Sequence, residues 1–306
     1  MQNLLLVVNY GGPQKGKERE YLKRLFSDPV LFPFPAPLRW ILGNLVALLR
    51  RGETAEILSA VGGTSPFLKQ TFEQAKALGK LLEGWEVGVA MRYSDPLLEE
   101  VLRNIAPERF ENIVLLPLFP QYSVATWGSV ERVVEKSPLK GKVKFAKPFY
   151  GCENFILGWV EAIEKTLKGL EKPFLLFSAH SLPLYLVRKY GDPYPKQVEE
   201  SAKLIAQRLE LPYKVSYQSR LGPIRWLEPT TEEALKKLRK DGVKELVVIP
   251  ISFVSENTET LQEIDLNYRQ LAENLGYHSF RRVKIPHLHP EWLECWKELA
   301  LATIRT

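Results

Sequence analysis

The chain has 306 residues, of which 45% are hydrophobic and 25% are charged. This is the composition of a globular protein long enough for two domains or one large one. No uncharged stretch reaches the roughly 20 apolar residues of a membrane-spanning helix. The first residues, Met1–Leu4, also lack the positive region of a signal peptide. We therefore expect a cytoplasmic protein.

The net charge of +6 is concentrated near the N-terminus. Residues 1–51 hold eight Lys and Arg against three Asp and Glu, so the rest of the chain is almost neutral. A nucleic-acid-binding protein has a different charge distribution, so no nucleic-acid partner is expected. Two cysteines, Cys152 and Cys295, and four histidines are too few for a disulfide framework, an all-cysteine iron–sulfur cluster or a resident zinc site. We expect no tightly bound cofactor.

Along the chain, short apolar runs alternate with helix-like segments. Continuous apolar runs bounded by Gly, Pro or Ser predict strands buried on both faces, as in a parallel sheet covered by helices. Residues 67–82, 155–167 and 197–209 have apolar positions at helical spacing. The predicted strands are Leu4–Val8, Val87–Met91, Ile113–Leu116 and Val143–Phe145, followed by Phe174–Phe177, Lys214–Tyr217, Leu246–Ile249 and Arg282–Ile285.

This order predicts two similar open α/β halves, residues 1–155 and 156–306, because four strand–helix units are followed by four more. The halves also resemble each other locally, since Leu116–Phe119 and Ile249–Ser252 both place a proline at the end of a third strand. Doubly wound sheets bind ligands at the carboxyl ends of their strands. The loops after the strands are therefore the place to look for a site.

The loop after the first strand contains paired glycines, in Asn9–Pro13. This loop does not match the dinucleotide fingerprint, and the chain has no phosphate-binding loop, so a nucleotide site is disfavoured. The fifth strand ends at His180, which lies among small residues. A catalytic histidine and a histidine bonded within the core both fit this position. The flanking serines lack the pattern of a hydrolase nucleophile.

The seventh strand leads into an acidic helix. Glu256, Glu259, Glu263 and Asn267 fall on one predicted helix face. A solvated acidic face is the ordinary explanation, but Glu259 begins the helix directly after a buried strand and so faces the strand ends. One histidine and a row of oxygen ligands suit a divalent cation such as Fe²⁺ that is passed on rather than held. His287 and His289 are predicted to lie in an exposed loop.

Aromatic and arginine residues occur in three further strand-end segments, residues 91–96, 120–123 and 218–226. A cleft with aromatic walls and scattered arginines fits a large flat ligand that carries carboxylates.

Seven segments in the same order together resemble the ferrochelatases, which insert ferrous iron into a porphyrin to make haem. The histidine segment FSAHSLP (177–183) and the acidic segment SENTETLQEID (255–265) are the most specific. The others are VNYGGPQ (8–14), VGGTSPF (61–67), MRYSDP (91–96), LPLFPQYS (116–123) and QSRLGPIRW (218–226).

The resemblance implies an α/β fold of two Rossmann-like halves, each a four-stranded parallel sheet flanked by helices, with the active-site cleft between them. It implies that His180 and Glu259 are catalytic and that both contact the metal, together with Glu263. Which of His180 and Glu259 delivers iron and which accepts protons stays open. The resemblance also implies that the porphyrin is bound by segments carrying Tyr10, Ser65, Arg92 and Trp226.

Two positions depart from the family pattern. Asp-His often precedes the essential glutamate, and here these positions are Glu256 and Asn257. A further glutamate often extends the acidic row, and here that position is Asn267. The first change removes one candidate ligand, and the second shortens the acidic row.

Residues 30–51 form the most apolar segment and end in Arg50 and Arg51. A core helix capped by arginines explains the pattern. A lip that dips into an anionic membrane at its inner face explains it equally well. Ferrochelatases have a hydrophobic lip at the mouth of the cleft, so the resemblance is compatible with the second explanation.

Several functional alternatives stay open. Related chelatases insert cobalt or nickel into other tetrapyrroles, and few ligands encode the choice of metal. Protoporphyrin IX is the expected substrate, with coproporphyrin as the alternative. A porphyrin or haem carrier without catalysis is a third reading. A preceding or following enzyme of haem synthesis is a candidate partner.

Overall fold

The computed structural model describes residues 2–32, 34–60, 65–220 and 224–305, apart from the side chains of residues 50, 51, 53, 57 and 60. The structure forms two compact units. The first comprises residues 1–119, 124–148 and 296–306, and the second comprises residues 120–123 and 149–295. The expected division at residue 155 therefore differs from the observed one, which lies a few residues earlier and assigns residues 120–123 and 296–306 to the opposite unit.

The first unit contains a four-stranded parallel sheet in the order β2-β1-β3-β4. The central strand β1 is buried along most of its length because both faces are covered. Helix α3 packs against β1 and β2. The strands are β1 (Gln2–Asn9), β2 (Trp85–Met91), β3 (Phe110–Pro117) and β4 (Val143–Phe145); the helices are α1 (Glu18–Phe26), α2 (Ala36–Ala60), α3 (Phe67–Leu81), α4 (Leu98–Asn104), η1 (Pro107–Arg109) and α5 (Trp127–Glu135).

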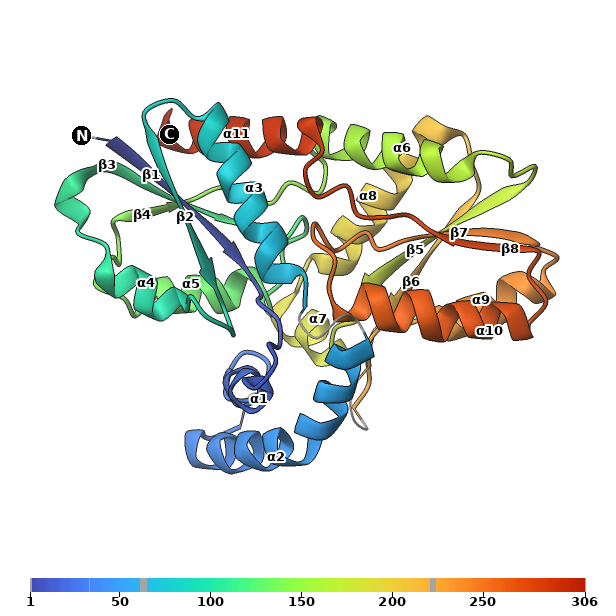
Figure 1. Cartoon of the computed structure of the whole chain (residues 1–306), viewed down its shortest axis with the longest axis horizontal. Helices are drawn as coiled ribbons and strands as arrows, with labels where there is room; N and C mark the ends of the chain where they lie inside the picture. Colours follow the sequence, from blue (N-terminus) through green and yellow to red (C-terminus); the bar gives the residue numbers. More distant parts are fainter. Residues whose placement is uncertain (1, 33, 61–64, 221–223, 306) are drawn as a thin grey trace. The chain divides into compact units, whose positions relative to one another are not determined.

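The second unit repeats this topology with the strand order β6-β5-β7-β8, again all parallel (Figure 1). The strands are β5 (Pro173–His180), β6 (Tyr213–Gln218), β7 (Glu245–Ile249) and β8 (Ser279–Arg282); the helices are α6 (Glu153–Leu167), α7 (Leu184–Tyr190), α8 (Tyr194–Leu209), α9 (Thr231–Lys240), η2 (Glu259–Tyr268) and α10 (Arg269–Asn274). The last helix, α11 (Pro290–Arg305), begins in the second unit, and its residues from 296 onward belong to the first.

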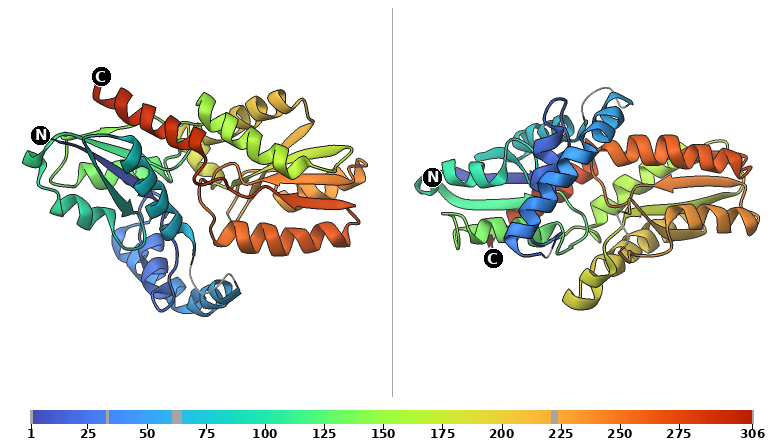
Figure 2. Two further views of the ribbon diagram at one scale, coloured as in Figure 1. Left: turned by 45° about the horizontal axis from the view of Figure 1, so that its top comes forward. Right: turned by 90° about the horizontal axis from the view of Figure 1, so that it is seen from below.

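Helices cover both faces of the second sheet, with α6 and α8 on one face and α9, η2 and α10 on the other (Figure 2). The core beneath η2 joins Leu176 of β5, Leu235 of α9 and Ile264 of η2, all nearly inaccessible to solvent. Apolar residues at these positions hold one face of η2 against the sheet, while Leu266 and Asn267 on the helix are exposed.

The predicted eight strands and their parallel arrangement are confirmed. The prediction for the last strand is wrong in position, because β8 ends at Arg282, where the predicted strand begins. Val283 and Ile285 are buried all the same, since the chain continues through the core after the last ladder contact. Short apolar runs show burial but do not show where pairing stops.

The two cysteines, Cys152 and Cys295, are paired as a disulfide within the second unit. His287 and His289 lie in the predicted loop before α11, but the prediction that His289 is exposed there is wrong. Its side chain is only 9% exposed, and its Nε2 lies 3.1 Å from Glu161 Oε2. Among the described residues, no three His, Cys, Asp or Glu side chains converge as a metal site.

Candidate functional site

In the second unit, strand order reverses between β5 and β7, which are neighbours in the sheet although β6 lies between them in the chain. Such a reversal leaves a crevice at the carboxyl ends of the two strands, where doubly wound folds bind their ligands. His180 is the last residue of β5, and the chain after β7 leads into η2. The topology therefore places the predicted histidine and the acidic helix at the same edge of the sheet.

The contacts of His180 fix which ring nitrogen is available. Its Nδ1 lies 2.8 Å from the carbonyl oxygen of Ser181, which can only accept a hydrogen bond. Nδ1 therefore carries the proton in the neutral ring, and Nε2 presents a lone pair. The hydroxyl of Tyr194 donates to the carbonyl oxygen of His180 at 2.9 Å and holds the end of β5 in place. The half-buried His180 ring thus offers one defined basic atom.

The acidic segment is a π-helix, η2, whose hydrogen bonds run from residue i to i+5. Asn257 and Thr260 bond each other reciprocally just before and within its first turn: Asn257 Oδ1 accepts from the Thr260 N–H at 2.9 Å, and the Asn257 N–H donates to Thr260 Oγ1 at 3.0 Å. The pair resembles a capping box, and Asn257 satisfies the Thr260 N–H at the start of the helical segment, which begins at Thr258. Glu259 follows, half-buried, and accepts from Thr258 Oγ1 at 3.0 Å.

The expected row of four oxygen ligands on one helix face does not form. Glu256 lies before the helix, 5% exposed, where it accepts from Arg282, Thr260 and the backbone N–H of Ile285. Asn267 is exposed. The helical spacing used for the prediction does not apply before the cap, because that chain segment is still a loop after a buried strand. Glu259 and Glu263 are the carboxylates that η2 presents near its start.

Glu263 is held by groups that sequence reasoning did not single out. Its Oε1 accepts from the Ser219 N–H at 2.9 Å and from Tyr268 Oη at 2.6 Å, and its Oε2 accepts from Ser219 Oγ. Ser219 has a φ of 64°, in the left-handed region that non-glycine residues rarely adopt. Burial, followed by the Glu263 charge, raises the pKa of Tyr268 far above its ordinary value, so its hydroxyl stays a donor. The only sequence signal for Ser219 was its place in the segment 218–226.

Trp226 is brought next to the histidine loop by an antiparallel bridge to Pro183. Leu184 N–H donates to Arg225 O at 2.8 Å, and Leu227 N–H donates to Leu182 O at 3.0 Å, so the bridge has a bond on either side. Residues 221–223 of the same motif lie outside the described residues. In the second unit, His180 thus ends β5, Trp226 follows β6, and Glu259 and Glu263 lie in η2 after β7.

The remaining predicted site residues belong to the first unit. Tyr10 follows β1 and packs edge-on against Tyr93, with ring centroids 4.7 Å apart. Ser65 is buried, and a side chain at Gly12 would lie 2.7 Å from its Oγ. The glycine at position 12 is therefore required by the close approach of Ser65, and the Gly-Gly pair is a packing feature. Residues 61–64 of the Ser65 motif lie outside the described residues.

Arg92 contributes to a buried network within the first unit. Its guanidinium donates to Asp28 at 2.9 Å, Glu99 at 2.8 Å and Ser129 at 2.7 Å. Tyr93 Oη also donates to Asp28, at 2.7 Å. Burial and then the Asp28 charge hold the pKa of Tyr93 well above its ordinary value. In this structure Arg92 links β2 to the end of α1, and its predicted contact with a substrate stays a prediction.

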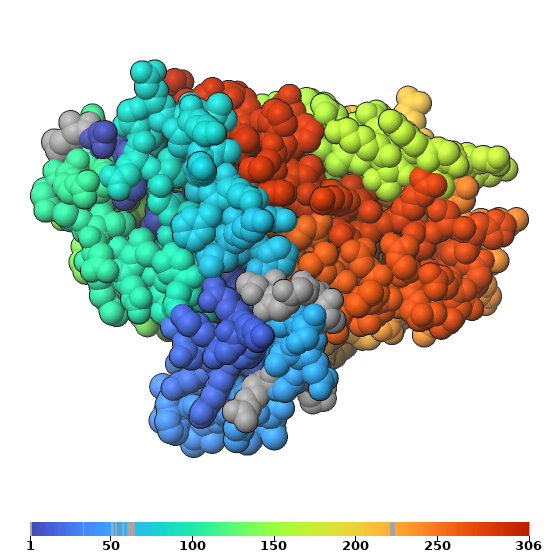
Figure 3. Space-filling model, in the orientation of Figure 1, coloured from blue at the N-terminus to red at the C-terminus, as the bar shows by residue number. Residues whose placement is uncertain are grey.

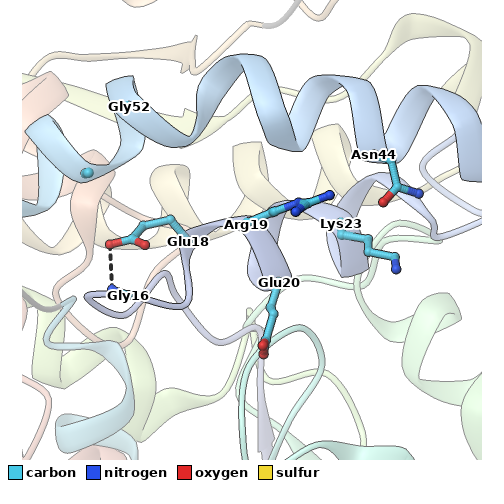
Figure 4. Close-up of a pocket in the computed structure, with 8 residues that line it drawn as sticks. Gly16, Glu18, Arg19, Glu20, Lys23, Asn44 and Gly52 are labelled. Carbon is cyan, nitrogen blue, oxygen red and sulfur yellow. Dashed lines mark hydrogen bonds between the residues drawn. The ribbon is translucent and has the colours of Figure 1, made fainter.

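A cavity in the first unit lies between α1 and α2 (Figure 4). It has a volume of about 710 Å³. Arg19 and Lys23 of α1 line it on one side and Asn44 of α2 on the other. Glu18 turns to the backbone N–H of Gly16, with which it makes a 2.9 Å hydrogen bond. Sequence reasoning did not identify this cavity, because it depends on how two helices pack.

Helix α2 lies on the surface of the first unit (Figure 3). Its outer face, the side that exposes apolar side chains to solvent, is strongly apolar. Trp40 is 61% exposed and Leu49 is 71% exposed. The side chains of Arg50 and Arg51 lie outside the described part of the structure. Within the described residues, no helix is sufficiently long and apolar to cross a membrane. The apolar residues of α2 exposed in this way are Leu38, Trp40, Ile41, Leu45, Leu48 and Leu49.

Comparison with solved structures identifies the fold. The chain matches SirB from Bacillus subtilis with Fe³⁺ at a TM-score of 0.59 and 12% identity, covering 100% of this chain and 95% of that one. It matches CbiX, the terminal enzyme of sirohaem biosynthesis in denitrifying bacteria, at a TM-score of 0.56 and 12% identity, covering 98% and 99%. At this identity the likeness shows a common two-unit fold and nothing finer.

Comparison of sequences identifies the family. The chain is 41% identical to the ferrochelatase of Aquifex aeolicus, over 98% of both chains. It is 40% identical to that of Picosynechococcus, over 95% of this chain and 80% of the relative. The family model described as "Ferrochelatase" matches residues 3–304. With its repeated parallel sheets and its histidine and acidic helix at one sheet edge, this chain belongs to the ferrochelatase family.

Proposed function

We propose that the chain inserts Fe²⁺ into a porphyrin, protoporphyrin IX in the first instance, and forms haem with the release of two protons. Family membership over almost the full length supports the activity. The observation that carries the assignment of residues is the defined lone pair of His180 Nε2 at the sheet edge that also bears the acidic π-helix. Iron is the substrate in this scheme, so no permanent metal site is required.

Metal insertion replaces two pyrrole N–H bonds with metal–nitrogen bonds, so two protons must leave for each Fe²⁺ that enters. His180 Nε2 accepts a proton directly, because its other nitrogen is committed to Ser181. Glu259 is the second acceptor or the group that releases iron to the ring. The Glu263 carboxylate accepts three hydrogen bonds, so one of its lone-pair sites stays available. Glu263 uses this site to pass a proton or positive charge onward from Glu259. Binding at the periphery of the ring supplies the energy to distort it.

The activity is tested by incubating the purified chain anaerobically with Fe²⁺ and either protoporphyrin or coproporphyrin, and by following the Soret and Q bands. We expect conversion of protoporphyrin to haem at a greater kcat/KM than conversion of coproporphyrin. Faster conversion of coproporphyrin would identify coproporphyrin as the substrate and leave the proposed reaction, insertion of iron, unchanged. Binding of either porphyrin without metallation would identify a carrier and contradict the proposal. Parallel reactions with Co²⁺ and Ni²⁺ test the choice of metal.

We propose as well that the outer face of α2 contacts an anionic membrane at its surface. Its exposed side chains include an indole and five aliphatic groups, and amphipathic helices of this kind insert their apolar face at the lipid interface. Arg19 and Lys23 lie on the neighbouring helix α1 and have no ion pair among the described residues. Cations beside an apolar face favour lipids with negative headgroups.

Co-sedimentation with vesicles tests this contact. The chain should bind vesicles that contain phosphatidylglycerol and bind neutral vesicles more weakly. The double variant Trp40→Glu, Leu45→Glu should lose most of the binding, because both side chains are at least 49% exposed on this face. Phe72→Glu is the matched control, since Phe72 is 47% exposed on α3. Equal binding by all three proteins would contradict the proposal.

A further inference from the structure

A buried arginine, Arg282, joins two acidic residues on either side of the first turns of η2. Arg282 Nη1 donates to Glu256 Oε1 at 2.8 Å. Its Nε and Nη2 donate to the two carboxylate oxygens of Asp265 at 2.8 and 2.7 Å. The Arg282 side chain is 8% exposed and that of Glu256 is 6% exposed, whereas Asp265 is 27% exposed. We call these three residues the arginine clamp.

The clamp spans the part of η2 that carries the proposed reacting carboxylate. Glu256 lies before the cap, and Asp265 lies within the helix, so Glu259 and Glu263 fall between the two residues that Arg282 holds. Glu256 also accepts from Thr260 Oγ1 at 2.6 Å and from the Ile285 N–H at 3.0 Å. The start of the helix is therefore fixed both to the end of β8 and to its own first turn.

The bonding of the clamp suits a positioning role. Two parallel bonds from a guanidinium to a carboxylate fix the orientation of both groups as well as their distance. Burial disfavours the charged guanidinium, but hydrogen bonds to Asp265 and attraction to Glu256 outweigh it, so the pKa of Arg282 lies above its ordinary value. The arginine is therefore a cation at neutral pH and can hold both carboxylates.

A π-helix is rare because its wider turn packs less well than an α-helix, and such helices persist where the surroundings hold them. The direction of Glu263 relative to Glu259 depends on this geometry, since a change to i→i+4 bonding would rotate the residues that follow the start of η2. We propose that Arg282 is a positioning residue: the arginine clamp keeps η2 in its π-helical register and thereby holds Glu259 and Glu263 in place beside the substrate. This inference rests on the proposed role of Glu259 in inserting iron into the porphyrin.

The first test compares Arg282→Met, Arg282→Lys and the control Arg281→Met. Arg281 is the neighbouring residue of β8, and its guanidinium bonds the carbonyl oxygens of Thr166 and Lys168, far from the clamp. A displacement of about 1 Å in a reacting group can cost on the order of 100-fold in rate. We therefore expect Arg282→Met to lower kcat for iron insertion by on the order of 10- to 100-fold with KM for porphyrin nearly unchanged.

Arg282→Lys retains the charge but loses the two-bond fork, so its kcat should fall between those of the wild type and Arg282→Met. Arg281→Met should behave as the wild type. Should Arg282→Met fail to fold, Arg282→Lys and Asp265→Asn decide the question. Wild-type kcat in the variants that fold, or a change confined to KM, would overturn the proposal, because neither follows from a displaced carboxylate.

A second readout does not depend on activity. Amide hydrogen exchange in residues 259–268 should accelerate in Arg282→Lys, while exchange in α9 stays at its wild-type rate. Unchanged protection of residues 259–268 would refute the clamp even in a chain that metallates porphyrin. Accelerated exchange in a chain that does not metallate porphyrin would keep the clamp and reject the proposed function.

Discussion

Single side chains set the geometry at the start and in the middle of the acidic helix. At its start, Asn257 takes the position of a histidine that the family often has, and its amide caps the helix through Thr260. Further along, Ser219 donates its backbone N–H to Glu263 while its own backbone is in the left-handed region. Such backbone conformations are costly for non-glycine residues and recur at functional sites. The two carboxylates are thus fixed by neighbours that do no chemistry themselves.

The cap gives a residue-scale prediction. Asn257→Ala should lower the free energy of unfolding by about 1 kcal/mol, because the N–H of Thr260 loses its side-chain acceptor. Urea denaturation followed by circular dichroism measures the change. Asn267→Ala is the control, since Asn267 lies exposed in the same helix. Equal stability of the two variants would show that the Asn257 side chain does not cap η2.

Sequence reasoning proposed His180 and Glu259 as site residues, because His180 ends and Glu259 follows a recognisable apolar strand, each within a specific motif. Their roles stay predictions. It could not identify Arg282 as a partner of Glu256, since the two lie in different segments and meet only when β7 and β8 pair. Glu256 itself was misassigned to the acidic row because helical spacing was applied to a loop. Charge pattern alone cannot distinguish a ligand from one half of a buried ion pair.

At the scale of elements, two aspartates tie the α1–α2 pair to the sheet of the first unit. Asp28, at the end of α1, is buried against Arg92 and Tyr93 of the β2 end. Asp95, just after β2, is partly exposed and pairs with Lys17 at 2.8 Å and with Arg24 at 3.0 Å. The position of the apolar face of α2 therefore depends on ionic contacts with the strand ends, which no local sequence pattern predicts.

The ion pairs of the partly exposed Asp95 predict how the stability of the fold depends on pH. The hydrogen bond from Lys17 and the charge of Arg24 hold the pKa of Asp95 below its ordinary value. A carboxyl whose pKa is lowered by folding stabilises the fold above its unfolded-state pKa, and this contribution disappears as the pH falls through the folded-state value. Asp95→Asn should therefore lower the midpoint of thermal unfolding at pH 7 by no more than about 4 °C, as for a surface ion pair.

The difference between the wild type and Asp95→Asn should shrink as the pH is lowered from about 5 to about 3, because the wild-type carboxyl then becomes protonated. Differential scanning calorimetry across this range measures it. A difference that stays constant or grows towards acid pH would show that Asp95 acts through something other than its charge.

At the scale of the whole molecule, one topology occurs twice, with strand orders β2-β1-β3-β4 and β6-β5-β7-β8. The repetition could be predicted because buried parallel strands read as continuous apolar runs. The division into units could not, because residues 120–123 and 296–306 each fold with the unit that their position in the chain does not suggest. Chain order carries no signal for such exchanges, which depend on where segments pack.

Each of the two sheets has a carboxyl end of its strands. The proposed chemistry takes place at that end of the second sheet, where His180 lies. The most direct test compares iron insertion by the wild type and His180→Ala, with porphyrin binding followed separately by fluorescence quenching. We predict that His180→Ala binds porphyrin but forms no haem above the uncatalysed rate, because the defined lone pair at the end of β5 is lost. Near-normal haem formation by folded His180→Ala would contradict the account.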